Sequence, residues 1–423
     1  MSTESRPEDT TPLARRRQTL ARLTALCGLA AAGGTAGVLS ACGGGGGDAA
    51  SPPVAGGPPP APPPPSGPPP TGPARTTTLT SSLASPWGMA FLPDGRLLIT
   101  EKGGTLRIAT LSGSTATLSG PVANVPVVVT MPNGQGGLLD VAIDPDFATD
   151  PWVYLTYVEG NANGDNSGTA VARGRLSGTQ LDNVAVIYRQ TPKVNGDGHF
   201  GSRLAFRSDR TLFVSLGERT RETPAQDLTG TLGKVVRINR DGSIPSGNPS
   251  LGAGARPEIW SYGHRNPQGA AVHPTTGDLW LVEHGPQGGD ELNRVVAGGN
   301  FGWPNVSYGC PYGASPANDA CRIGGGVHSP GYVEPVSYWP PQSIAPSGLM
   351  FYTGAGFPEW QGNAMLGALA GTALWRIALN GATEVSRERL FGSLGQRIRC
   401  VKQGPDGWIY LLTDSGRLVR IDR

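Results

Sequence analysis

One unit recurs along most of this chain: a short apolar run, a turn and a second apolar run. Apolar runs on both sides of Asp-Gly and similar turns indicate β-hairpins. The unit returns typically every fifty to seventy residues. Repeats of this length with several strands are typical of a β-propeller, whose closed ring leaves few free strand edges. Six copies can be identified, at Trp87–Ile108, Leu138–Val158, Ser202–Glu218, Gln268–Gly285, Ser347–Leu369 and Arg399–Ile421.

These copies predict an all-β fold, a six-bladed β-propeller of four-stranded antiparallel blades. No long segment shows the helical period of about 3.6 residues, so a helical domain is not expected. A large β-sandwich is the alternative all-β fold, but it would not require the repeat.

The N-terminal part of the chain has a different composition. Residues 1–41 join a basic stretch, Ala14–Arg22, to an apolar run, the pattern of an export signal peptide. The sequence LSAC, which ends at Cys42, resembles a bacterial lipobox and predicts a lipidated cysteine; an ordinary signal peptide or a poor transmembrane anchor is the alternative. Residues 42–75 are rich in Gly and Pro and predict a semi-rigid tether. Residues 76–423 remain for the propeller, the predicted catalytic domain.

Charge and cysteine usage narrow the possible partners. Without the five arginines and three acidic residues of positions 1–41, the 34 basic and 32 acidic residues of the chain become 29 of each. This balance predicts no nucleic-acid partner, and a membrane contact only through lipid at Cys42. We expect an exported protein, a periplasmic or cell-surface lipoprotein of a bacterium. In that oxidising compartment Cys310 and Cys321 are expected to form a disulfide, and Cys400 to be buried.

Polar motifs stand where the strands of the copies begin or end. Loops at one rim of a propeller converge on its central channel, so these motifs are expected to meet there. In GQRIRC the alternation places Arg397 and Arg399 on one face of a strand, where two guanidinium groups suit a planar polyanion. The motifs are GQGGLLD (Gly134–Asp140), GHFGSRLAF (Gly198–Phe206), YGHRNPQG (Tyr262–Gly269), EHGPQGGDELN (Glu283–Asn293) and GQRIRC (Gly395–Cys400).

The order and wording of these motifs, together with GNFGWPN (Gly299–Asn305), resemble the soluble quinoprotein glucose and aldose sugar dehydrogenases. The resemblance runs from about Leu83 to the C-terminus and is nearest to the aldose branch. It implies a six-bladed propeller that uses pyrroloquinoline quinone (PQQ) and Ca²⁺ to oxidise aldose sugars at the anomeric carbon to lactones. The electrons would pass to a respiratory quinone or cytochrome.

The resemblance also implies roles for individual residues. His199 matches the general base, a task that suits an imidazole because its pKa lies near the working pH. Arg265 matches a catalytic cation beside the quinone oxygens, where it would stabilise negative charge. The residues that match cofactor contacts are Gln135, His199, Arg265, Asn266, His284, Arg397 and Arg399.

Two calcium sites are implied in the same way. The carbonyl groups of Gly285 and Pro286 match ligands of the calcium that touches the quinone, and Ca²⁺ takes such oxygens readily. Glu291 and the carbonyl group of Phe301 match a second, structural calcium.

The chain departs from the family pattern at Ala370, where the family usually has a lysine that touches the cofactor. Loss of this cation leaves two other hypotheses open. One is a non-enzymatic propeller that binds a sugar or a protein, and the other is a calcium-dependent hydrolase of the lactonase type. Binding of the quinone with sugar-dependent dye reduction would separate the dehydrogenase from both.

Overall fold

The computed structural model describes residues 72–131, 134–161, 164–315 and 317–423. The predicted signal peptide, Cys42 and most of the predicted tether lie outside these residues. Among the described residues no helix is long and apolar enough to cross a membrane. The helices present there are short 3-10 turns, at Thr223–Ala225 (η1), Asp319–Cys321 (η2), Ile323–Gly325 (η3), Pro358–Trp360 (η4) and Gly392–Leu394 (η5).

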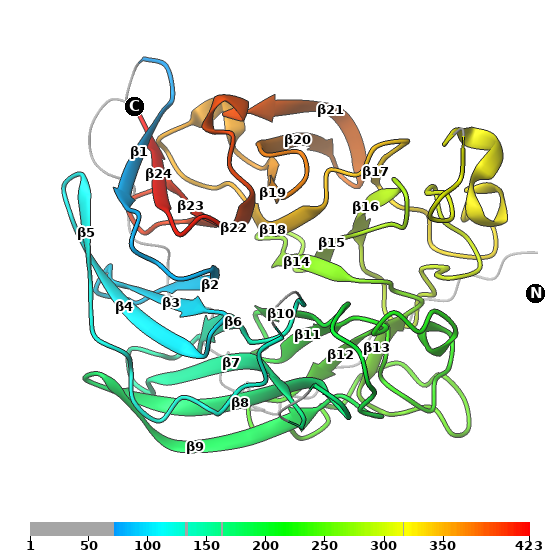
Figure 1. Cartoon of the computed structure of the whole chain (residues 1–423), viewed down its shortest axis with the longest axis horizontal. Coiled ribbons are helices and arrows are strands. Elements are labelled where there is room, and N and C mark those ends of the chain that lie inside the picture. The colour runs from blue at the N-terminus through cyan, green and yellow to red at the C-terminus, as the bar shows by residue number, and fades with distance from the viewer. Residues whose placement is uncertain (1–71, 132–133, 162–163, 316) are drawn as a thin grey trace, which may run out of the picture. The chain divides into compact units, whose positions relative to one another are not determined.

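The strands form six four-stranded antiparallel sheets, the blades, around a common centre (Figure 1). Blade 1 consists of β2 (Pro86–Phe91), β3 (Leu97–Glu101), β4 (Thr105–Ser112) and β5 (Thr115–Leu118). Blade 2 consists of β6 (Leu138–Ile143), β7 (Trp152–Glu159), β8 (Gly168–Ser177) and β9 (Gln180–Arg189). Blade 3 consists of β10 (Gly201–Phe206), β11 (Leu212–Leu216), β12 (Lys234–Ile238) and β13 (Ile259–Tyr262).

The chain continues around the ring in the same order. Blade 4 consists of β14 (Pro267–Val272), β15 (Leu279–Glu283), β16 (Asp290–Arg294) and β17 (Ser337–Trp339). Blade 5 consists of β18 (Pro346–Phe351), β19 (Ala364–Ala368), β20 (Leu374–Asn380) and β21 (Thr383–Leu390). Blade 6 consists of β22 (Ile398–Gln403), β23 (Ile409–Thr413), β24 (Leu418–Asp422) and, at its outer edge, β1 (Arg75–Thr80).

Two connections close the ring. β1 pairs with β24, so the first strand of the domain completes the last blade. The first strands of neighbouring blades contact one another all the way round, including β2 against β22. Each of the six repeat copies begins at the first or second residue of the first strand of a blade. The predicted six-bladed propeller is therefore confirmed, and its first strand starts at the predicted end of the tether.

Hydrophobic packing between the blades follows the same six-fold arrangement. Six clusters of buried apolar side chains lie one at each contact between consecutive blades. In blade 1, for example, all of Leu97, Leu98 and Ile99 are fully buried, because both faces of β3 are covered by neighbouring blades. A blade removed from the ring would expose both faces, so the apolar runs of the sequence require the closed ring.

Every first strand carries a register shift near its start, where it pairs with the second strand of its blade. Such β-bulges re-aim side chains and are frequent at barrel rims and beside active sites. Glycines permit the close approach of these strands. A Cβ atom at Gly348 (φ +68°) would lie 2.8 Å from the backbone nitrogen of Val401, and one at Gly269 would lie 2.8 Å from the backbone of Gly348.

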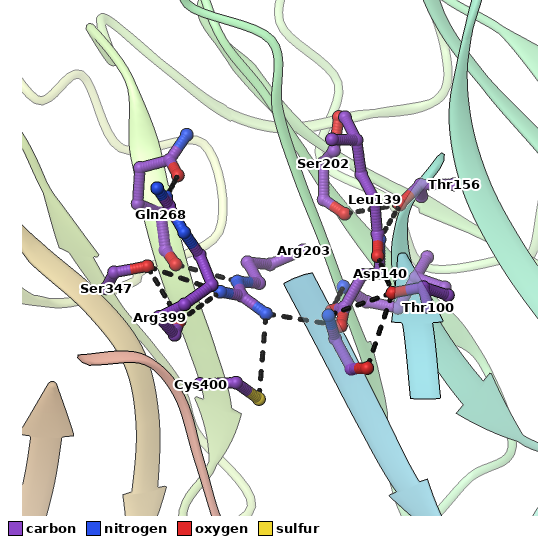
Figure 2. Close-up of polar contacts among 12 residues, drawn as sticks. Thr100, Leu139, Asp140, Thr156, Ser202, Arg203, Gln268, Ser347, Arg399 and Cys400 are labelled. Atoms are coloured by element: carbon purple, nitrogen blue, oxygen red, sulfur yellow. Dashed lines mark hydrogen bonds and ion pairs between the residues drawn. The ribbon is translucent and has the colours of Figure 1, made fainter. Parts of the chain in front are cut away.

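Arg203 of β10 lies at the centre of the ring and contacts the first strand of every other blade. Figure 2 shows its contacts with blades 2, 4, 5 and 6. Its guanidinium group donates to the carbonyl oxygens of Gln268 (2.7 Å) and Arg399 (2.8 Å) and to Asp140 Oδ1 (3.2 Å). It also reaches Ser347 Oγ (3.4 Å) and lies 3.8 Å from the centre of the Trp87 ring. Arg203 is 3% exposed and Asp140 2%, so this ion pair is held away from water.

Substitution of Arg203 by methionine is expected to lower the free energy of unfolding by about 3–5 kcal/mol, because it leaves the buried Asp140 carboxylate unpaired. Arg96→Met is the matched control. The Arg96–Asp94 ion pair is 42% and 51% exposed, and exposed pairs contribute only about 0–1 kcal/mol. Urea unfolding of both variants tests the prediction, and equal losses would contradict a central role for Arg203.

Candidate active site

The candidate site lies at the face of the ring where the first strands begin, hereafter the site face. Each first strand is preceded by a lead-in segment at this face. Since the strands of a blade alternate in direction, the turn between its second and third strands lies there too. Residues far apart in the sequence are thereby brought together around the centre of this face, hereafter the channel mouth.

His199, in the lead-in segment of β10, is oriented by two neighbouring side chains. Its Nδ1 atom bonds Oε1 of Glu218, which lies in the turn after β11. Its backbone NH donates to Oε1 of Gln135 (3.0 Å), from the lead-in segment of β6. The side chain of His199 is 12% exposed and that of Glu218 1%. The bond at Nδ1 leaves Nε2 as the nitrogen that can accept a proton.

The electrostatic surroundings favour a neutral imidazole. Burial lowers the pKa of His199 below its ordinary value; the hydrogen bond to Glu218 opposes this, and the charge of Arg265 adds to it. Burial also opposes ionisation of Glu218. The bond to His199 and those from the backbone NH groups of Glu222 and Arg221 outweigh it, so the pKa of Glu218 lies below its ordinary value. Near neutral pH the pair is therefore a carboxylate and a neutral ring.

A chain of side-chain amides crosses the channel mouth and rests on Arg203. Asn266 Nδ2 donates to Oε1 of Gln135 (3.3 Å), and its Oδ1 accepts from Gln268 Nε2 (3.1 Å). Oε1 of Gln268 in turn accepts from Arg399 (3.3 Å). The same Gln268 offers its backbone carbonyl to Arg203. This floor joins blades 2, 4 and 6, and Figure 2 shows the part around Gln268, Arg399 and Arg203.

The guanidinium group of Arg265 has no carboxylate partner among the described residues. It donates to the carbonyl oxygens of Gly285 (2.7 Å) and His284 (3.2 Å) and to the hydroxyl of Tyr312 (3.0 Å). Its buried Nε atom has no hydrogen-bond partner within the described part of the chain. Glu283 accepts the backbone NH of Arg265 (2.9 Å) and bonds His264 and Asn293, but it does not bond the guanidinium group.

The sequence predicts Arg397 and Arg399 on one face of a strand, but only Arg399 lies in β22; Arg397 is the residue just before that strand. Both donate to Asp414, which lies in the turn after β23 (2.9 Å from each Nε). A further cation, Lys102, lies in the turn after β3 at the same face. Of the four cations Lys102, Arg265, Arg397 and Arg399, the first two have no ion pair among the described residues, and the other two share Asp414. These incompletely paired cations suit an anionic ligand.

The loop after β15 presents backbone oxygens to the site. A Cβ atom at Gly285 would lie 2.3 Å from the carbonyl oxygen of Gly288 and 2.4 Å from that of Gly289, so only glycine fits there. Asp290 holds the loop, because Oδ1 accepts from the Gly285 NH (3.0 Å) and Oδ2 from the Ile344 NH (2.7 Å). Burial raises the pKa of Asp290 to about 6.

His284, from the same loop, bonds the carbonyl oxygen of Pro346 through Nε2 (3.0 Å). Burial, followed by the charges of Arg265 and Arg399, lowers its pKa to about 3, so this ring is neutral. His284 therefore adds no charge to the mouth and ties the loop to blade 5.

The residues predicted to hold calcium are close together. Gly285, Glu291 and Phe301 line one small cavity, and Pro286 follows Gly285 directly. Glu291 accepts from Asn293 (3.0 Å) and lies 3.4 Å from His328 Nε2. Among the described residues no group of three or more His, Cys, Asp or Glu side chains is placed to hold a metal. Any cation here would depend largely on carbonyl oxygens.

The structure thus brings together all the predicted site residues, and adds several that motif reasoning missed. Glu218, Asp414 and Lys102 each follow the second strand of a blade, outside the motifs that precede the first strands. Tyr312 lies in the loop closed by Cys310 and Cys321, whose predicted disulfide is confirmed, as is burial of Cys400. Ala370 is exposed in the turn after β19 at the same face.

A family model described as "Glucose / Sorbosone dehydrogenase" matches residues 83–420. The chain belongs to this family. Within the family, it is 43% identical over 349 residues to the aldose sugar dehydrogenase YliI of Escherichia coli strain K12, covering 81% of this chain and 91% of that protein.

Solved structures agree with the family assignment. The soluble aldose sugar dehydrogenase of Escherichia coli in the apo-form matches with a TM-score of 0.76 and 42% identity, over 82% of this chain and 99% of that one. The PQQ-bound form of the aldose sugar dehydrogenase of Streptomyces coelicolor matches with a TM-score of 0.65 and 28% identity, over 84% and 99%. The family's propeller therefore accounts for nearly all of the described chain.

Substitution of Glu218 by glutamine is expected to lower the pKa of His199 further, because the carboxylate is the group that raises it. An NMR titration measures this directly, since the chain has only five histidines. His273 serves as the internal control, because it follows the end of β14 at the opposite face. An unchanged or raised pKa of His199 would show that Glu218 does not bond the ring in solution.

Proposed function

We propose that this protein oxidises aldose sugars at the anomeric carbon to lactones, with PQQ and Ca²⁺ as cofactors and His199 as general base. The observation that carries the proposal is a neutral imidazole, oriented by Glu218, at a channel mouth with an excess of cations. Membership of a sugar dehydrogenase family and the names of the two aldose sugar dehydrogenases support an oxidoreductase that acts on sugars.

The residues present fit the proposed cofactor. Bound PQQ, a tricarboxylated quinone, supplies the two-electron acceptor that the amino acids themselves lack. Arg397 and Arg399 would hold its carboxylates, and Gln135 and Asn266 would meet its polar edge. The unpartnered Nε of Arg265 offers a further donor, and its positive charge would stabilise negative charge that develops beside it.

The proton transfer in this proposal involves His199 and Glu218. Nε2 of His199 takes the proton of the anomeric hydroxyl, and Glu218 stabilises the resulting imidazolium through Nδ1. Because the pKa of His199 lies below its ordinary value, the ring is neutral and able to accept this proton near neutral pH. The partial exposure of the ring then allows the proton to pass to solvent.

Carbonyl groups of Gly285 and Pro286 would hold a calcium ion in the same proposal, supplying a Lewis acid next to the cofactor. The fit rests on this loop, whose carbonyl oxygens of His284 and Gly285 face the site and accept from Arg265. The Gly285 carbonyl already accepts from Arg265, but a carbonyl oxygen has a second lone pair. Glu291 and the carbonyl group of Phe301 would hold the second calcium at their shared cavity.

We also propose that the enzyme acts outside the cytoplasm, anchored by lipid at Cys42. β1 runs antiparallel to β24 and therefore begins at the face opposite the site face. The described domain thus begins away from the channel mouth.

Reconstitution of the chain without residues 1–75 with PQQ and Ca²⁺ is expected to give sugar-dependent dye reduction. In His199→Ala, turnover should fall about 100- to 10,000-fold, the usual contribution of a general base, while the quinone still binds. His273→Ala, at the opposite face, is the matched control and should keep its activity. Failure of the wild-type protein to bind PQQ would contradict the proposal and favour a binding propeller. Lactone turnover without quinone would favour a hydrolase.

Replacement of Gly285 by alanine is expected to raise the calcium concentration for half-maximal reconstitution about 10- to 100-fold, because the new Cβ would clash with the carbonyl oxygens of Gly288 and Gly289 and so distort the loop that carries the proposed ligands. Gly120→Ala is the control, since a Cβ atom there meets nothing within 4 Å. Chelation of calcium should abolish reconstitution of the wild type and re-addition should restore it. Full reconstitution in the presence of a chelator would show that no exchangeable calcium is needed.

A further inference from the structure

Lys102 is a cation at the channel mouth that no part of the proposed mechanism uses. It lies in the turn after β3, is half-buried, and donates from Nζ to the carbonyl oxygen of Gly134 (2.9 Å). The next residue, Gln135, accepts from both His199 and Asn266 through its side chain. Lys102 therefore lies next to the residues that are proposed to meet the cofactor.

The charges around Lys102 leave it without a counter-ion of its own. No ion pair between described residues involves Lys102, and its bond to Gly134 uses one of three NH groups. Burial, then the charge of Arg399, lowers the pKa of Lys102, whereas Asp414 acts in the opposite direction. Asp414 is already shared by Arg397 and Arg399. Three cations thus face one carboxylate, an arrangement that an anionic ligand would relieve.

This chain has Ala370 where the family usually has a lysine, so the position of Lys102 relative to Ala370 bears on ligand binding. Ala370 lies in the turn after β19, and Arg376 does not replace its charge because it pairs with Glu388 (2.9 Å) and Asn363 (2.8 Å). Lys102 lies in the equivalent turn of blade 1, also between the second and third strands. Both turns lie at the site face, with blade 6 and its two arginines between them.

We propose that Lys102 binds a carboxylate group of PQQ and supplies the cation that this chain lacks at Ala370. The proposal rests on the proposed function, because it requires PQQ to occupy the channel mouth. A purely structural role, in which Lys102 only ties the turn to Gly134, is the alternative. If Lys102 binds the ligand, a lysine introduced elsewhere around the ligand should compensate for its loss. If Lys102 is only structural, that lysine should not restore affinity.

The test is an equilibrium titration of PQQ into the calcium-loaded chain lacking residues 1–75, followed by quenching of tryptophan fluorescence. Lys102→Met is expected to raise the dissociation constant about 10- to 100-fold, the value of one hydrogen bond between charged groups. Ala370→Lys in the same background should restore most of the affinity. Lys402→Met is the control, because Lys402 lies near the end of β22 at the opposite face.

Each outcome decides the proposal. Loss of affinity in Lys102→Met with an unchanged thermal midpoint of the quinone-free protein, and recovery with Ala370→Lys, supports it. Loss of affinity with a lowered midpoint and no recovery overturns it in favour of the structural role. Equal affinities of the wild type and Lys102→Met overturn the Lys102 proposal alone. A wild-type protein that does not bind PQQ overturns the proposed function and this inference together.

Discussion

The buried ion pair between Arg203 and Asp140 is the interaction on which the rest of the structure depends. A propeller ring has no covalent closure, and its six hydrophobic contacts act only between neighbouring blades. Arg203 is different because its single side chain contacts the first strands of all the other blades. Its partner Gln268 carries the amide floor of the site, so the geometry of the channel mouth rests on this pair.

Next to that floor, one group of residues is suited to proton transfer and another to binding an anion. Glu218 orients His199 and completes a pair that can accept one proton. On the other side, Arg397 and Arg399 share Asp414, and Arg265 has only carbonyl and hydroxyl partners. An excess of cations around a ligand site stores unfavourable repulsion that an anionic ligand relieves. The same arrangement explains how the chain could tolerate Ala370, provided that another cation meets the ligand.

Much of this was predictable from sequence, because the propeller repeats its signals. The six apolar copies mark the first strands, and the residues before them, such as His199, Arg265 and Asn266, were expected at one rim. Glu218, Asp414 and Lys102 were missed because they follow the second strands, where no motif marks them. Closure of the ring brings their partners to them from other blades. Lys102 of blade 1 donates to the carbonyl oxygen of Gly134, just before blade 2, and the charge of Arg399 of blade 6 lowers the pKa of Lys102. The spacing of residues along the sequence does not predict such contacts between different blades.

Single-turnover reduction of the bound cofactor tests the central claim most directly. The reconstituted protein is mixed with an aldose sugar without dye or oxygen, and the absorbance of the quinone and the amount of lactone are followed. We expect loss of the oxidised quinone spectrum with one lactone formed per bound quinone, and a large decrease in rate in His199→Ala. A quinone that binds but stays oxidised in the presence of every aldose tested would contradict it.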